Sequence, residues 1–262
     1  MIFFRLSKYL KYIILSHHRK GHGIHSPFVF NLIIRVFRNK TDPGIVSMVE
    51  TVRKRLLTDH RSITITDLGA GSERNKSTSR KVSEIAKRSP VPGKYGALLS
   101  NMAAEFGGSH IIELGTSFGI STMYMAAACP GTIVSTIEGS SDIAGIALEN
   151  FREAGMQNIN VYKGSFDEVL PLVIEKGNVP GLVFIDGNHR KEPVLKYFGI
   201  IAGKADDATV VIVDDINYSP SMASAWDEIR NHEKVSVSID LNRMGIVFFR
   251  SGISHNDYQI RY

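Results

Sequence analysis

The chain has 262 residues and a mass of 29.0 kDa, which favours one domain with an appendage over two full domains. Its 43% hydrophobic and 22% charged residues exclude collagen-like, disordered and disulfide-rich classes. A single cysteine, Cys129, excludes an intramolecular disulfide and a cysteine-cluster zinc site, and it suits a cytoplasmic location. The net charge of +5 permits a nucleic acid or an anionic membrane as partner but demands neither, and we expect no nucleic acid.

The first 16 residues predict an amphipathic helix. Arg5, Lys8 and Lys11 interrupt an apolar run at three-residue spacing, so they share one face of a helix. No small-residue cleavage site follows, which argues against a signal peptide, and the apolar run is shorter than the ~20 residues that cross a bilayer. Two roles stay open: docking onto the main domain, and peripheral contact of residues 1–16 with the inner face of a membrane.

A second helix is expected just after this segment. Ser26 and Pro27 form a helix start, and the apolar residues that follow suit a buried helix. His22 and His25 lie beside this start. They are weak candidates for metal ligands, because no third ligand accompanies them.

Residues 38–92 are polar and basic, and they predict a connector or lid. Within them, residues 63–72 look like a strand that ends in a glycine-rich nucleotide loop. No packed helix and no second apolar strand follow, so we interpret residues 63–72 as a chance match to such a loop, called the decoy below. We expect no cofactor role for Asp67. The expected division is an N-terminal helical extension with its connector, residues 1–92, and a main domain, residues 93–262.

From residue 94 onward, short apolar runs alternate with helical stretches, which indicates an open α/β sheet. We place strands at 110–114, 132–137, 158–162, 181–185, 208–213, 235–239 and 244–250. Helices are expected at 95–106, 119–128, 142–154, 166–176, 191–202 and 221–232. Only a few residues around Asn242 join the last two strands, which predicts an antiparallel hairpin. This ending departs from the layout of dinucleotide-binding sheets.

The first strand of this sheet ends at a glycine-containing turn. Gly115 and Gly119 let the backbone approach a ligand at the carboxyl end of the strand, where open α/β sheets bind. The spacing is Glu-x-Gly-x-x-x-Gly and not Gly-x-Gly-x-x-Gly. Glu113 therefore suits a ligand with an ammonium group better than a pyrophosphate. Packing alone also explains such glycines.

The next two strands end in further candidate ligand-binding residues. Glu138 closes the second strand, 23 residues after Gly115, where a carboxylate accepts both hydroxyls of a ribose. An exposed acid that leads into a helix is the alternative. Ser165 and Phe166 follow the third strand and are placed to flank a purine, although Phe166 also suits the core.

Four segments in this order resemble the class I S-adenosylmethionine-dependent methyltransferases, and within them the catechol O-methyltransferase-like group. The segments are Glu113–Ser121, Ile137–Glu138, Phe184–His189 and Val211–Asp215. The resemblance covers residues 94–250. It implies an α/β fold with a doubly wound, seven-stranded Rossmann-like sheet whose last strand is antiparallel. The helical N-terminal extension lies outside it.

The resemblance also implies an enzyme that uses S-adenosyl-L-methionine and methylates a hydroxyl of a small molecule. The cofactor residues that it implies are Glu113, Gly115, Thr116, Ser117 and Ser121 for the methionyl part, Glu138 for the ribose, Gly164, Ser165 and Phe166 for the adenine, and Asp186.

Three aspartates predict a divalent-cation site. Asp186, Asp214 and Asp215 follow the fourth and fifth strands, and unpaired carboxylates that converge favour a hard cation such as Mg²⁺ or Ca²⁺. In the catechol-type relatives, the resemblance implies Asp, Asp and Asn as the metal ligands at these positions. Asp215 departs from that Asn. The added charge either tightens metal binding or marks a branch that orients substrate without metal.

His189 is the candidate general base, with Asp186 beside it. The resemblance implies a lysine at this position in catechol enzymes, and an imidazole, with its usual pKa of about 6.5, can also take a proton from a hydroxyl. Tyr218, Met222 and Trp226 suggest an apolar, aromatic acceptor pocket. The alternative for Met222 and Trp226 is the buried face of a helix, because they are four residues apart.

Two other functions stay open at this stage. One is a noncatalytic membrane-associated binding module, because the N-terminal helix is basic. The other is a different Rossmann-type nucleotide-binding enzyme, which the missing Gly-x-Gly-x-x-Gly weakens. The sequence also leaves a homodimer open.

Overall fold

The computed structural model describes residues 2–16, 23–65 and 78–262. His22 and the loop residues 66–72 of the expected decoy, including Asp67, lie outside these ranges. The described part of the decoy is strand β1 (Ser62–Ile65). It pairs only with β2 (Thr78–Lys81), as an antiparallel two-stranded sheet separate from the main sheet.

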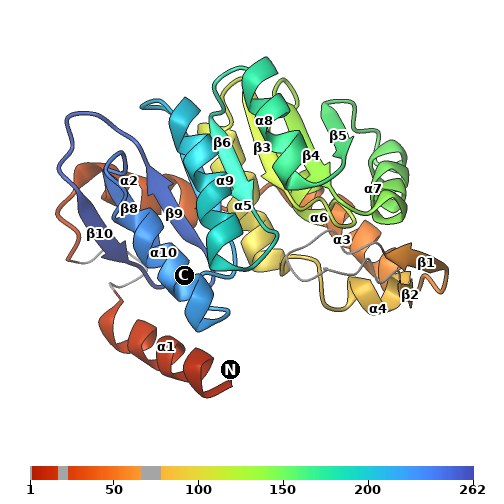
Figure 1. Cartoon of the computed structure of the whole chain (residues 1–262), viewed down its shortest axis with the longest axis horizontal. Coiled ribbons are helices and arrows are strands. Elements are labelled where there is room, and N and C mark those ends of the chain that lie inside the picture. The colour runs from red at the N-terminus through yellow and green to blue at the C-terminus, as the bar shows by residue number, and fades with distance from the viewer. Residues whose placement is uncertain (1, 17–22, 66–77) are drawn as a thin grey trace.

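The main sheet has eight strands in the order β10-β8-β9-β7-β6-β3-β4-β5 (Figure 1). Seven of them confirm the predicted strands, and β9 is antiparallel to both neighbours, as expected of the hairpin. The eighth, β10, pairs in parallel with β8 and was not predicted. The bounds are β3 His110–Leu114, β4 Ile133–Glu138, β5 Ile159–Lys163, β6 Leu182–Ile185, β7 Val210–Val213, β8 Val237–Asp240, β9 Gly245–Phe248 and β10 Asn256–Gln259.

The central strands end in register. Leu114 of β3 pairs with Ile137 of β4 and with Ile185 of β6, and Ile185 pairs with Val213 of β7. Because these strands are parallel, the residues that follow each of them lie along one edge of the sheet. The sequence segments Gly115–Gly119, Asp186–His189 and Asp214–Asp215 are therefore brought together there.

Helices cover both faces of the sheet (Figure 1). Alternate strand residues face opposite sides, so Ile111 and Phe184 pack on one layer while Ile112 and Val183 pack on the other. The first layer contains α2 Pro27–Leu32, the π-helix Ile33–Phe37, α3 Pro43–Leu57, α5 Gly93–Phe106, α6 Ile120–Ala128 and α7 Ser141–Glu153. The second contains α8 Phe166–Lys176, α9 Lys191–Lys204 and α10 Pro220–Arg230.

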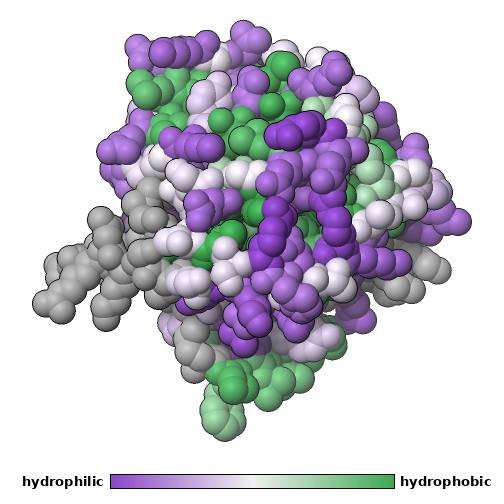
Figure 2. Space-filling view, turned by 90° about the vertical axis from the view of Figure 1, so that its right-hand side faces the viewer, coloured by the Kyte–Doolittle hydropathy of each residue, from purple (hydrophilic) through white to green (hydrophobic). Residues whose placement is uncertain are grey.

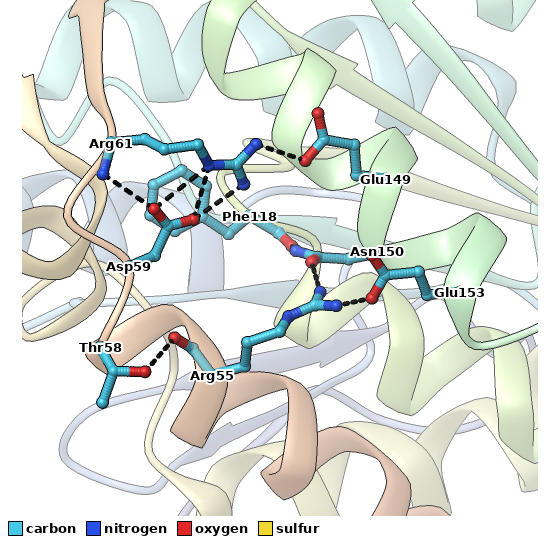
Figure 3. A network of polar contacts seen from close by, with 8 residues as sticks. All are labelled: Arg55, Thr58, Asp59, Arg61, Phe118, Glu149, Asn150 and Glu153. Atoms are coloured by element: carbon cyan, nitrogen blue, oxygen red, sulfur yellow. Dashed lines mark hydrogen bonds and ion pairs between the residues drawn. The ribbon is translucent and has the colours of Figure 1, made fainter.

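The expected connector carries regular structure, because it also contains α3 and α4 (Val82–Ala86). Val49 and Val52 of α3 are buried in the same hydrophobic cluster as strand β3. The end of α3 and the turn after it are tied to α7 (Figure 3). Arg55 donates to Asn150 over 2.5 Å, and Arg61 donates to Glu149 over 2.9 Å. The connector is thus held against the sheet domain by packing and by charged hydrogen bonds.

Helix α1 (Ile2–Leu15) confirms the helix predicted at the N-terminus, and it lies at one side of the molecule (Figure 1). One of its sides is docked. Buried Tyr12 donates its hydroxyl to the Ile260 carbonyl and accepts the Tyr262 backbone N–H, both over 2.8 Å. Arg5 donates to the backbone carbonyl of Tyr218 over 2.9 Å. No helix within the described ranges is long and apolar enough to cross a membrane.

Candidate functional site

A cavity of about 460 Å³ opens at the carboxyl edge of the parallel strands, within the usual size of small-molecule sites. Loops after β3, β4, β5, β6 and β7 form its walls. The predicted site residues that line it are Gly115, Ser117, Glu138, Gly164, Ser165, Phe166, Asp186, His189 and Asp215.

The backbone at this edge is unusual. Ser117, Asn188 and Asp215 have φ values of 48°, 56° and 53°, in the left-handed region that residues with side chains seldom adopt. All three line the cavity, and one follows each of the strands β3, β6 and β7. Gly115 has φ 105°, and a Cβ there would lie 2.2 Å from the Asp186 carbonyl oxygen. Such conformations cluster at functional sites.

Glu138 is held in one orientation by the backbone. Its Oε2 accepts the N–H of Ser117 over 2.9 Å, and its Oε1 accepts the N–H of Ser140 over 2.9 Å. Burial raises the pKa of Glu138, while these backbone N–H groups act in the opposite direction. Each oxygen keeps a further acceptor site, and the residue lines the cavity, so the carboxylate can receive two hydroxyl groups of a ligand.

Glu113 lies beneath the cavity wall. It is fully buried and accepts hydrogen bonds from the hydroxyls of Ser121 and Thr122 over 2.5 Å and of Thr136 over 2.6 Å. Thr116 and Thr136 also share a hydrogen bond of 2.6 Å. Burial raises the pKa of Glu113 to about 7. Glu113, Thr116 and Ser121 therefore do not line the cavity, in contrast to the direct ligand contacts that the motif suggested.

The wall after β5 is aromatic. Ser165 caps α8 by accepting the N–H of Glu168, and Phe166 lies edge-on to Tyr197 with ring centroids 5.6 Å apart. Asn188 donates to the Tyr197 hydroxyl over 3.1 Å, which joins this wall to the loop after β6. All of these residues except Glu168 line the cavity.

Asp186 and His189 come from the loop after β6 and lie close to each other. Nε2 of His189 lies 3.8 Å from Oδ1 of Asp186, and the His189 ring lies 5.9 Å from that of Tyr218. Burial and the charges of Asp214 and Asp215 raise the pKa of Asp186 well above its usual value. An imidazole beside a carboxylate at a cavity wall can accept a proton from a hydroxyl.

Asp214 is paired with an arginine that sequence reasoning missed. The Arg243 Nε donates to Oδ1 over 2.9 Å and its Nη2 donates to Oδ2 over 2.6 Å. The same Nη2 lies 3.8 Å from Oδ1 of Asp215. Asp214 is fully buried and does not line the cavity, whereas Arg243 does.

The predicted divalent-cation site does not fit these residues. A cation at Asp186, Asp214 and Asp215 needs carboxylate oxygens that are free to turn toward it. Both oxygens of Asp214 instead bond to the Arg243 guanidinium, whose own charge repels a cation. Within the described ranges, no three His, Cys, Asp or Glu side chains are grouped as metal ligands.

The acceptor side of the cavity differs from expectation in part. Tyr218 lines the cavity, but Met222 and Trp226 are buried in the hydrophobic layer of α10, as the helical alternative for them predicted. Arg5 of α1 covers Tyr218, with its guanidinium carbon 3.9 Å from the ring centroid. The connector contributes another wall, where the Ser89 and Ser117 hydroxyls are 2.7 Å apart.

The comparisons with known proteins agree with this architecture. Residues 112–216 match the methyltransferase domain family. The catechol O-methyltransferase of Niastella koreensis is 31% identical over 132 residues, which are 49% of this chain and 57% of that protein. O-methyltransferase imqG of Aspergillus flavus is 30% identical over 133 residues, 48% of this chain and 52% of its own. The chain thus spans about half the length of the curated relatives it matches.

A solved structure shows the same fold over a longer stretch. The O-methyltransferase TomG of Streptomyces achromogenes, determined in complex with SAM, superposes with a TM-score of 0.57 at 18% identity. The match covers 83% of this chain and 96% of that one. Residues 112–216 thus resemble a methyltransferase domain, and the overall fold is that of a solved methyltransferase structure. The resemblance predicted from the four sequence segments is confirmed.

Proposed function

We propose that this chain is an S-adenosylmethionine-dependent O-methyltransferase that acts on a hydroxyl of a small molecule. The observation that carries the proposal is a single cavity that joins Glu138, the turn after β3 and the Asp186–His189 pair. The named O-methyltransferases among the relatives support the same reaction. They do not favour a noncatalytic module or another nucleotide-binding enzyme.

In this proposal the cofactor lies along the carboxyl edge. Glu138 accepts the ribose hydroxyls, because two backbone N–H groups already fix its orientation. Ser165 and Phe166 flank the adenine, with Gly164 leaving room beside them. The methionyl part approaches Gly115 and Ser117, where a side chain at Gly115 would collide with the backbone.

The buried residues of the motif support this turn from below. Glu113 accepts from Ser121 and Thr122 at the start of α6, so it fixes that helix against β3. Thr116 bonds to Thr136 of β4 and holds the turn on the neighbouring strand. We propose that Glu113, Thr116 and Ser121 position the residues that touch the cofactor.

The acceptor hydroxyl is deprotonated by His189. S-adenosylmethionine, when bound, supplies a methyl group on a positively charged sulfur. Nε2 of His189 would take the proton that the acceptor hydroxyl must lose when its oxygen receives the methyl group. Asp186, 3.8 Å away, stabilises the resulting imidazolium. Tyr218 and Tyr197 in the walls favour an aromatic acceptor.

The test combines cofactor binding with a search for the acceptor. Calorimetry should detect binding of S-adenosylmethionine, and Glu138→Ala should weaken it roughly ten- to hundredfold, since charged hydrogen bonds contribute about 1.5–3 kcal/mol. Asp67→Ala, in the expected decoy, is the control and should leave the affinity unchanged. A Glu138→Ala affinity within twofold of wild type would refute the ribose assignment.

The acceptor is sought by incubating the protein with methyl-labelled cofactor and a cell metabolite extract, followed by mass spectrometry of the labelled products. A labelled methyl ether on a small molecule supports the proposal. Label found only on nitrogen or carbon, or NAD binding without S-adenosylmethionine binding, contradicts it.

We further propose that α1 binds an anionic membrane surface. Figure 2 shows hydrophobic surface at the bottom of the molecule, where α1 lies in Figure 1. The exposed apolar residues recur three or four positions apart on the side away from Tyr12, and they are Ile2, Phe3, Leu6, Leu10, Ile13 and Ile14. This is the arrangement of a helix that lies in a lipid interface.

The charge distribution indicates what kind of surface the exposed face of α1 binds. No Asp or Glu precedes Asp42, while residues 1–41 contain eight Lys and Arg. With 31 basic and 26 acidic residues in all, the remaining chain has 23 against 26, a net charge of −3. The whole positive excess thus lies on the segment that carries the apolar helix face, which suits anionic lipid.

Vesicle cosedimentation tests this contact. The protein should pellet with phosphatidylglycerol vesicles and not with phosphatidylcholine vesicles, and Leu6→Ser with Leu10→Ser should abolish pelleting. Leu172→Ser, an exposed leucine on α8, is the matched control. If the wild type fails to pellet but sediments as a dimer that Leu6→Ser disrupts, a second copy covers α1 and the membrane proposal is wrong.

A further inference from the structure

Asp186, Asp214 and Asp215 form a cluster of carboxylates at the ends of two neighbouring strands. Three negative charges so close together are costly unless a positive charge accompanies them. The sequence predicted a divalent cation as the neutralising group at these three aspartates. The described residues supply a different one.

Arg243 is that group. It lies in the turn between β8 and β9, and its Nε and Nη2 hold both oxygens of Asp214 in a two-pronged hydrogen bond. This geometry is specific to a guanidinium, because a lysine offers no matching pair of donors. Burial disfavours the charged form of Arg243, but the hydrogen bonds to Asp214 and the charges of Asp215 and Asp186 outweigh it and raise its pKa.

Arg243 is also placed to act on a ligand. It lines the same cavity as His189 and Asp215, and its side chain is 28% exposed there. Within the described ranges, its third nitrogen, Nη1, forms no hydrogen bond. A fixed positive charge with a spare donor, in the same cavity as the proposed base, favours the anionic form of an acceptor oxygen.

We propose that the Arg243 guanidinium takes the place of the divalent cation in this enzyme: it neutralises the aspartate cluster and stabilises the acceptor oxygen as its proton passes to His189. The inference rests on the proposed methyl transfer for its catalytic half only. Its electrostatic half states that Arg243 supplies the positive charge that neutralises the aspartate cluster. This half does not depend on any acceptor being bound.

Cation binding tests the electrostatic half. Wild-type protein titrated with Mn²⁺ should show no stoichiometric binding by electron paramagnetic resonance. Arg243→Gln keeps a hydrogen-bond donor near Asp214 but removes the charge, so it should gain a Mn²⁺ site, and adding Asp186→Asn should remove that gain. Arg190→Gln, at the start of α9, is the matched control and should bind no Mn²⁺. Stoichiometric Mn²⁺ binding by the wild type overturns the proposal.

Turnover tests the catalytic half, once labelling has revealed an acceptor. Wild-type activity should be unaffected by chelator. Arg243→Gln should lose roughly 10²-fold in turnover, the range for removing one donor to a developing oxyanion, with S-adenosylmethionine affinity nearly unchanged. Arg243→Lys should restore part of it. Full activity of Arg243→Gln in chelator, or loss of wild-type activity there, overturns this half.

Failure of the two proposals is distinguishable. If the protein transfers no methyl group to any acceptor but Arg243→Gln gains Mn²⁺, the proposed function fails while the internal cation stands. If Arg243→Gln does not fold, the Mn²⁺ titration of Arg243→Lys still tests the electrostatic half. This variant retains the positive charge, so it should bind no Mn²⁺. Mn²⁺ binding by Arg243→Lys would show that the cluster prefers a metal.

Discussion

Glu113 and Glu138 are acids of neighbouring strands with different surroundings. Glu113 is enclosed by three side-chain hydroxyls, whereas Glu138 accepts two backbone N–H groups at the cavity wall. A hydroxyl group can rotate, so it can donate a hydrogen bond to a carboxylate or accept one from a protonated carboxyl group. A backbone N–H group can only donate. Glu113 can therefore take up a proton in place, and Glu138 is held as an acceptor.

Glu113 makes the stability of the protein depend on pH. Its pKa is about 7 in the folded protein against 4.5 in the unfolded chain, so the folded state binds the proton more tightly. Stability should consequently fall as pH rises from about 4.5 to about 7 and then level off.

Glu113→Gln should lack this contribution. Denaturant unfolding at a series of pH values measures the difference in free energy of unfolding between wild type and variant. We expect that difference to shift in favour of the variant as pH rises through this interval. A difference that is constant with pH would show that Glu113 is already ionised in the folded protein.

His189 is expected to affect turnover and not cofactor binding. His189→Ala should lower turnover by roughly 10²–10⁴, the range for losing a positioned general base. Calorimetry with S-adenosylmethionine should show nearly wild-type affinity. His25→Ala, an exposed histidine outside the cavity, is the control. Normal turnover with weakened cofactor binding would move His189 from the acceptor site to the cofactor site.

At the scale of elements, the turns that follow the paired strands β3 and β6 approach each other closely at Gly115. Gly115→Ala places a Cβ 2.2 Å from the Asp186 carbonyl at φ 105°, so one turn has to shift. We expect a loss of about 1–3 kcal/mol in unfolding free energy, the usual cost of a residue in a sparsely populated backbone region. Gly145→Ala in α7 meets nothing within 4 Å and should stabilise the helix slightly. Equal stability of the two variants would contradict the close approach.

The apolar patterns predicted most of the fold. The central strands of the main sheet have apolar runs such as Val210–Val213, which are buried on both faces. Strand β10 has the polar sequence Asn256–Gln259 and lies at the edge, bonded only to β8, so no hydrophobic signal marks it. Helix α3 was not predicted, although Val49, Val52 and Leu56 follow helical spacing. Basic residues lie between Val52 and Leu56, so the segment has the composition of a polar connector.

The candidate site was predictable where a residue ends a strand or directly follows one. Glu138 ends β4, while Gly115 and Asp186 directly follow β3 and β6, and all three line the cavity. Arg243 lies 29 positions from Asp214 in a turn without a motif, so only the folded sheet brings the two together. The burial of Glu113 could not be predicted either. It depends on hydroxyl partners from α6 and β4, and the spacing of residues in the sequence does not show that these partners meet Glu113.

At the scale of the whole molecule, α1 joins the exposed apolar face to the cavity through Arg5 and Tyr218. Arg5→Ala should loosen both α1 and the loop at Tyr218. An exposed cation–π contact contributes about 0.5–1 kcal/mol, so amide hydrogen exchange there should accelerate about two- to fivefold. Lys11→Ala, also exposed on α1, should change neither segment. Faster exchange in α1 alone would show that the helix and the loop are independent.

The left-handed residues Ser117, Asn188 and Asp215 have a consequence for how a ligand is received. Each is locked at the end of a central strand, so the edge of the sheet is already shaped before anything binds. The entropy of ordering that edge is lost during folding and not during binding. Adaptation to differently shaped acceptors then falls to the other walls, the connector at Ser89 and the α1-covered Tyr218. If the proposed function is correct, the binding site for the methyl donor is rigid, whereas the binding site for the acceptor can adjust its shape.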